Sequence, residues 1–182
     1  IYDIDRPVSF INIFDFTIMN FPILSSLILL PTIGALFLLF SKDKNSNTGK
    51  YVALFTSFVN FLISIYLWYL FDPSTSSFQF VESRDWLKGF VNYKVGIDGI
   101  SILFIILTTL ITPLCIISVN NTIKVRLRDF LIAILVMESL MIGVFCSLDL
   151  VVFYLFFEAG LIPMFLIIGI WGGERRVYSA FK

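Results

Sequence analysis

Five long apolar runs, separated by polar or mixed segments, dominate the chain. A helix rises about 1.5 Å per residue, so about 20 apolar residues are enough to cross the roughly 30 Å hydrocarbon core of a bilayer. The runs lie at about residues 21–40, 51–70, 97–119, 130–147 and 149–171. This pattern predicts an all-α fold, a polytopic transmembrane helix bundle of about five spans within residues 21–182.

The segments outside these runs contain most of the charged residues. Residues 1–20 mix acids and one arginine with aromatic residues and lack the features of a signal peptide, which predicts an interfacial N-terminal lead-in. Residues 71–95 form the longest connection and mix aromatic with charged side chains, as is typical of the headgroup layer. A cofactor or partner site in that connection is a less favoured alternative. Asp98 and Ser101, in the GIDGIS motif, are expected to cap the third span.

The basic residues are divided unequally between the two sides of the predicted bundle. Nine lie on the side of the C-terminus and four on the side of the N-terminus. Lysine and arginine favour the cytoplasmic side of a membrane. We therefore expect the N-terminus outside, or in the intermembrane space, and the C-terminus in the cytoplasm or the mitochondrial matrix. The basic residues Arg175, Arg176 and Lys182 are interpreted as part of this anchor.

Composition narrows the range of functions. The chain is 58% hydrophobic and 14% charged. Globular proteins have about 25% charged residues, so this composition indicates an integral membrane protein. Zero net charge and the lack of a basic run argue against nucleic-acid binding. With no histidine and two cysteines there is no credible ligand set for haem, zinc or an iron–sulfur cluster, so no cofactor or metal is expected in this chain. Cys115 and Cys146 should lie near opposite membrane faces without forming a disulfide.

Glu158 is the one charged residue between residues 150 and 171. An acid in the middle of a span costs on the order of 3 kcal/mol on insertion scales, so it should face a partner or a wet cavity. Pro163 removes a backbone donor and leaves the carbonyl of Ala159 free, so a kink beside the acid can hold water. A purely structural role, as a hydrogen-bonding acid between helices, is the less favoured alternative.

A second acid, Glu138, lies in the preceding span. The two spans are joined by a few residues around Leu148, and each acid is ten positions from it. Because a short connection makes neighbouring helices antiparallel, we expect both carboxylates near the midplane. Two acids at matched depth have a proton affinity that burial and nearby charges can tune, which is typical of a proton relay. For Glu138, a structural role is an equally weighted alternative.

The segment FFEAGLIPMFLIIGIWGG, at residues 156–173, resembles the fifth transmembrane helix of chain 4 of respiratory NADH:ubiquinone oxidoreductase, complex I. Four further segments resemble the same family in serial order. They are FDPSTSSFQFVES at 71–83, GIDGIS at 96–101, LTTLITPLCI at 107–116 and LMIGVFCSLDL at 140–150. The resemblance covers nearly the whole chain from about residue 21.

The resemblance implies an antiporter-like subunit of the membrane arm, which moves a proton when quinone is reduced elsewhere in the complex. Glu158 would be the fifth-helix acid that pairs with a lysine on a later helix, and Glu138 would match a fourth-helix position that is often acidic. NADH, FMN, iron–sulfur clusters and ubiquinone would belong to the parent complex. The location implied is the mitochondrial inner membrane, with a bacterial cytoplasmic membrane as the alternative.

The chain departs from the family in length, because the family continues for many more helices and the five predicted spans contain no lysine. We therefore hypothesise a split, cleaved or partial chain, completed by a second polypeptide with the remaining helices. Other membrane-arm subunits would be its further partners. Two other functions stay open: a component of a secondary cation/proton antiporter, and a structural helix bundle in which Glu158 affects only stability.

Overall fold

The computed structural model describes residues 22–40, 46–87, 91–119, 123 and 126–173. The predicted interfacial lead-in at residues 1–20 and the basic residues Arg175, Arg176 and Lys182 lie outside this part of the chain. The membrane orientation inferred from the basic residues therefore stays a prediction.

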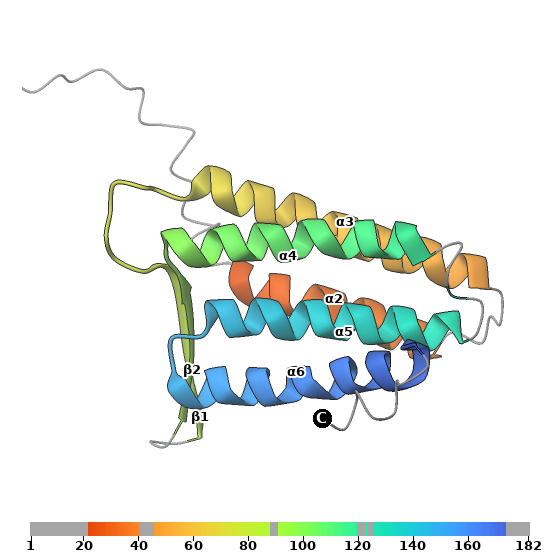
Figure 1. The fold of residues 1–182 in the computed structure, drawn as a ribbon. Helices are drawn as coiled ribbons and strands as arrows, with labels where there is room; N and C mark the ends of the chain where they lie inside the picture. Colours follow the sequence, from red (N-terminus) through yellow and green to blue (C-terminus); the bar gives the residue numbers. More distant parts are fainter. Residues whose placement is uncertain (1–21, 41–45, 88–90, 120–122, 124–125, 174–182) are drawn as a thin grey trace, which may run out of the picture.

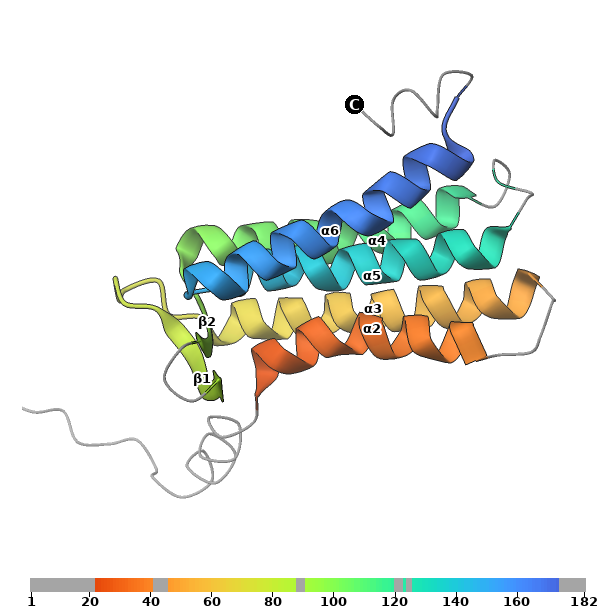
Figure 2. The ribbon, with the colours of Figure 1, turned by 90° about the horizontal axis from the view of Figure 1, so that it is seen from below.

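Five helices form an elongated bundle in which they run side by side (Figures 1 and 2). They are α2 (Ile23–Phe40), α3 (Ser46–Leu70), α4 (Gly99–Ser118), α5 (Leu127–Cys146) and α6 (Leu150–Trp171). Within the described residues, all five are long and apolar enough to cross a membrane. The predicted polytopic helical fold with five spans is confirmed.

The connection between α3 and α4 contains a β-hairpin that sequence analysis did not predict. Strands β1 (Gln79–Leu87) and β2 (Val91–Ile97) pair in an antiparallel sheet that lies at one end of the bundle (Figure 1). The register is irregular between Gln79 and Glu82 and again between Asp85 and Leu87, so the alternation of side chains along β1 is broken. Because β2 continues to Ile97, the third membrane helix begins at Gly99.

The hairpin is fixed to the helices on two sides. On one side, the carboxylate of Glu82 accepts hydrogen bonds from the backbone N–H of Leu24 at 2.8 Å and of Ser25 at 3.2 Å, at the start of α2. On the other, the backbone N–H of Leu148 donates to the carbonyl of Lys94 at 2.9 Å, between α5 and α6. Acid side chains at a helix N-terminus satisfy free amides and the helix dipole. The hairpin therefore bridges the start of α2 and the α5–α6 connection.

Helix α5 is the centre of the bundle. It packs against the other four helices, whereas α6 packs mainly on α5 and β2. Two apolar clusters fill the interior, one near the hairpin around Leu27 and Ile142 and one toward the opposite end around Leu38 and Leu135. Along helices α3, α4 and α5, the buried polar side chains lie between the residues of one cluster and those of the other. The two apolar clusters thus enclose a polar layer near mid-height.

The contact between α5 and α6 depends on the absence of a side chain at Gly143. A Cβ atom at Gly143 would lie 2.6 Å from the Phe156 ring, whereas one at Gly160 on the facing helix would meet nothing within 4 Å. Close helix contacts in membranes rely on such small residues. Gly143→Ala is therefore expected to displace α6 and to destabilise the protein by about 1–2 kcal/mol. Gly160→Ala, the matched control, should leave the thermal unfolding temperature nearly unchanged; equal effects would contradict this packing.

The predicted cap of the third span is confirmed. The Asp98 carboxylate accepts a hydrogen bond from the backbone N–H of Ser101 at 2.7 Å. This bond lowers the pKa of Asp98, so its stabilisation is present above the unfolded pKa of about 3.9 and is lost as the pH falls. Asp98→Ala is expected to cost about 1 kcal/mol at neutral pH and less at pH 3. Unfolding measured at both pH values checks this, and a cost independent of pH would contradict the assignment.

Candidate functional site

Glu138 lies inside the bundle, on the side of α5 that faces α3. Its side chain is 2% exposed, and the side-chain amide of Asn60 donates a hydrogen bond to Oε1 at 2.9 Å. The second carboxylate oxygen of Glu138 and the amide oxygen of Asn60 are both buried without a hydrogen-bond partner among the described residues. Buried polar atoms are rarely left unsatisfied, so this pair can hold a proton or a bridging water.

Further polar side chains continue the layer around Glu138 and Asn60. The hydroxyls of Ser64 and Thr109 are 2.8 Å apart and join α3 to α4. Those of Thr32 and Ser139 are 2.7 Å apart and join α2 to α5. Hydrogen bonds between membrane helices contribute about 0.6–2 kcal/mol each. The polar layer therefore crosses four helices near mid-height and fixes the rotation of each helix.

Glu158 points away from this interior. It lies on an exposed face of α6, a helix whose buried residues are Val152 and Pro163. The Tyr154 side chain, one helical turn earlier, is exposed on the same helix. The sequence predicts a partner or a wet cavity for this acid. Within the described residues no other helix covers it, so a partner would have to approach α6 from outside the bundle.

The two acids have matching depths but different surroundings. Glu138 lies eight residues before the end of α5 at Cys146, and Glu158 lies eight residues after the start of α6 at Leu150. At about 1.5 Å per residue, each is about 12 Å from the hairpin end of its helix. The structure thus brings the two acids to one level on neighbouring antiparallel helices. Because Glu138 faces α3 and Glu158 faces outward, it does not join them in one carboxylate pair.

Pro163 is a buried residue of α6, five positions after Glu158. It lacks a backbone N–H, so the carbonyl of Ala159 has no partner in the helical ladder. Ala159 lines a cavity between α6, α5 and α2. Figure 2 shows α6 crossing α5 obliquely.

Asn60 is the residue of this site that sequence analysis missed. It is the one asparagine among the apolar residues 51–70, and an amide in a membrane span is costly enough to mark a site. Ser139 also carried little information in the sequence. Its role follows from its contacts with Thr32 and with the backbone carbonyl of Ile28.

The family model described as "NADH:quinone oxidoreductase/Mrp antiporter, TM" matches residues 147–182. NADH-quinone oxidoreductase subunit M of Rhodobacter capsulatus is 57% identical over 140 residues, which cover 77% of this chain and 26% of that protein. Subunit M of Rickettsia prowazekii is 45% identical over 168 residues, covering 90% of this chain and 34% of the relative.

The similarity extends to plants. NADH-ubiquinone oxidoreductase chain 4 of Marchantia polymorpha is 45% identical over 161 residues, which cover 87% of this chain and 32% of that protein. The chain thus spans about a quarter to a third of the length of the curated relatives it matches. These similarities confirm the family predicted from the motifs: the chain is a relative of NADH-quinone oxidoreductase subunit M and NADH-ubiquinone oxidoreductase chain 4, and matches their N-terminal portion.

Proposed function

We propose that the chain forms part of the membrane arm of a proton-translocating NADH:quinone oxidoreductase, complex I, and contributes Glu158 to a proton path. The similarity to subunit M and chain 4 supports the assignment to this complex. The observation that carries the role of Glu158 is its position, as an exposed acid near the middle of the least buried membrane helix. An acid that faced only lipid at this depth would be costly, so Glu158 is expected to contact a polar partner in the assembly.

In this proposal, Glu158 alternates between a protonated state and a state paired with a lysine. The described spans contain no lysine apart from Lys50 near the start of α3, so a later helix supplies it. That helix belongs to the two thirds or more of the relatives' length that this chain does not span, either on a second polypeptide or on a continuation. Moving a proton against 100 mV costs about 2.3 kcal/mol, so quinone reduction elsewhere must drive the change.

Glu138 is proposed as a second acid, inside the bundle. Its hydrogen bond to Asn60 leaves one carboxylate oxygen free to hold a proton or to accept from water. Because Glu138 and Glu158 lie at one level on neighbouring helices, a proton transfer between them would need only lateral movement through intervening water or side chains. Pro163 would assist by freeing the carbonyl of Ala159 beside Glu158.

The remaining parts of the reaction are assigned to other chains. NADH, FMN, iron–sulfur clusters and ubiquinone would be bound by other subunits of the parent complex, and this chain would pack against neighbouring membrane-arm subunits. The location would be the mitochondrial inner membrane, or the cytoplasmic membrane of a bacterium, since the relatives include proteins of plants and of bacteria.

A secondary cation/proton antiporter is the second candidate. The matched family is described by both "NADH:quinone oxidoreductase" and "Mrp antiporter". An acid within a membrane span that pairs with a cation serves either process, because both require a proton to be held and released within the membrane. The two candidates differ in their partners, since an antiporter needs no redox subunits.

Isolation of the native assembly tests the proposal. The membrane is solubilised gently, the particle that contains this chain is purified, and its polypeptides are identified by mass spectrometry. Flavin and iron–sulfur subunits are expected, together with a polypeptide region that carries the later helices. Antiporter subunits without redox subunits would overturn the proposal in favour of the second candidate, and migration as a lone chain would favour a structural bundle.

A further inference from the structure

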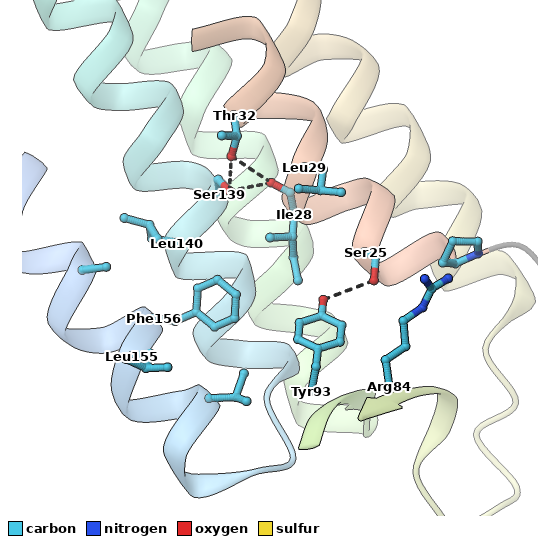
Figure 3. A pocket seen from close by; sticks show the side chains of 13 residues that line it. Ser25, Ile28, Leu29, Thr32, Arg84, Tyr93, Ser139, Leu140, Leu155 and Phe156 are labelled. Carbon is cyan, nitrogen blue, oxygen red and sulfur yellow. Dashed lines mark hydrogen bonds between the residues drawn. The ribbon is translucent and has the colours of Figure 1, made fainter. Parts of the chain in front are cut away.

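A cavity of about 860 Å³ lies between α2, α5, α6 and the hairpin (Figure 3). We infer that it is a phospholipid-binding groove, in which Arg84 binds the phosphate and the apolar walls hold an acyl chain. The groove shares Ala159 with the proposed proton path, but the inference rests on Arg84 and the apolar walls and not on that path. Its lining includes Ser25, Leu29, Thr32, Arg84, Tyr93 and Leu155.

The groove has a charged end and apolar walls. Arg84 and Tyr93 of the hairpin lie with Ser25 at one end, while Leu29 and Leu155 line the sides (Figure 3). The helices begin or end at this level, so the charged end coincides with the boundary of the apolar span. A phospholipid has the same arrangement of charged and apolar parts, with its phosphate at the interface and its acyl chains in the hydrocarbon layer.

The hairpin places Arg84 where its guanidinium can bind an anion. Arg84 and Tyr93 are cross-strand partners, so their side chains leave the same face of the sheet. The Glu82 carboxylate is already hydrogen-bonded to the first amides of α2. Among the described residues no ion pair occupies the Arg84 guanidinium. A guanidinium binds a phosphate through two parallel hydrogen bonds, which favours this ligand over a neutral one.

Tyr93 adds a second donor. Its hydroxyl lies 3.2 Å from the Ser25 hydroxyl, and burial raises the pKa of the Tyr93 phenol. The phenol therefore keeps its proton throughout the physiological pH range. The Ser25 hydroxyl already donates to the Glu82 carboxylate, so Tyr93 is the hydroxyl of this pair that can turn its proton to a phosphate oxygen.

The depth of the groove fits one leaflet. Its walls run over eight residues of α2, from Ser25 to Thr32, and over eight of α6, from Val152 to Ala159, so each wall spans seven helical steps. At about 1.5 Å per residue this is about 10 Å, less than half of the roughly 30 Å hydrocarbon core. An acyl chain from one leaflet fits this depth, whereas a membrane-spanning helix would have to continue past it.

The position of the hairpin also argues against a transmembrane helix as the occupant of the groove. It is bonded to α2 through Glu82 and to the α5–α6 connection through Lys94, so it crosses the end of the groove. A helix seated between α2 and α6 would meet the hairpin where the span ends. A lipid headgroup ends at that level and places its phosphate against Arg84.

A photoreactive lipid tests this site in the native assembly. The particle is reconstituted in vesicles of phosphatidylcholine and phosphatidylglycerol that contain a phospholipid with a diazirine on its acyl chain. After irradiation, labelled peptides are mapped by mass spectrometry. Adducts are expected around Leu29 and Leu155, and Arg84→Gln should lower them about tenfold relative to adducts at Leu103, on an exposed part of α4.

Lys94 offers the matched control. It pairs with Ser83, one position along the hairpin from Arg84, so its side chain leaves the opposite face. Lys94→Gln removes the same charge and should leave the adducts unchanged, while Leu29→Trp should lower them by filling the groove. Equal labelling in the Arg84→Gln and Lys94→Gln proteins would overturn the inference. A groove that stays unlabelled in the native protein, because another helix covers it, would also overturn it.

Discussion

Replacement of Glu158 by glutamine is expected to reduce the number of protons moved per electron, without reducing the amount of assembled protein. Glutamine keeps the size and polarity of the side chain but cannot release a proton or pair with a lysine as an anion. The carboxylate is exposed on α6, so its replacement removes no packing inside the bundle. Proton uptake and NADH oxidation measured together in sealed vesicles give the ratio directly.

Two variants separate the charge of Glu158 from its position. Asp129→Asn removes an exposed acid in the first turn of α5 and should leave the ratio unchanged. Glu158→Asp keeps the carboxylate and should retain part of the native number of protons moved per electron. If Glu158→Gln pumps as well as the native protein while its assembly is normal, Glu158 is not part of the proton path.

Replacement of Asn60 by leucine is expected to destabilise the bundle by about 3 kcal/mol. The substitution leaves a 2% exposed carboxyl group without its hydrogen bond, and a buried group that loses its partner bears the full desolvation cost. The double variant Asn60→Leu/Glu138→Leu should recover most of this stability, because two apolar side chains then face each other. Proton translocation should not recover with it, since the interior acid is gone. Thermal unfolding of the purified assembly measures the stability difference.

Ser57→Ala is the control for this pair. Ser57 is as buried as Asn60, but its hydroxyl donates only to the carbonyl of Leu54 in its own helix. Its loss should change stability by less than about 1 kcal/mol. A double variant no more stable than Asn60→Leu alone would show that the hydrogen bond between α3 and α5 is not the source of the effect.

The positions of the helices could be predicted from sequence because membrane spans depend on length and hydrophobicity. The hairpin could not, because its bulges break the alternation by which a strand is recognised, and its aromatic and charged residues equally suit an interfacial loop. Its attachment through Glu82 involves residues 57 and 58 positions apart in the chain. Such a contact follows from tertiary packing rather than from any local pattern.

The two acids of the candidate site could also be predicted from the hydrophobicity of the spans, whereas their surroundings could not. Charged residues within a span stand out, so Glu138 and Glu158 were identified, and their depth followed from the short connection between α5 and α6. The direction in which each acid points was not predictable, because α5 and α6 are apolar around most of their circumference. Asn60 was overlooked because an uncharged amide is a weaker signal than an acid, although it is the direct partner of Glu138.

Zero-length crosslinking at Glu158 tests the central claim most directly. A carbodiimide that enters the membrane joins a carboxylate to an adjacent amine, and mass spectrometry of the native assembly then identifies the partner. The account predicts a crosslink between Glu158 and a lysine in a membrane helix outside the residues described here, which is lost in Glu158→Gln. If Glu158 reacts as a lipid-exposed acid and forms no crosslink, it has no cationic partner, and the proposed alternation between protonated and lysine-paired states is wrong.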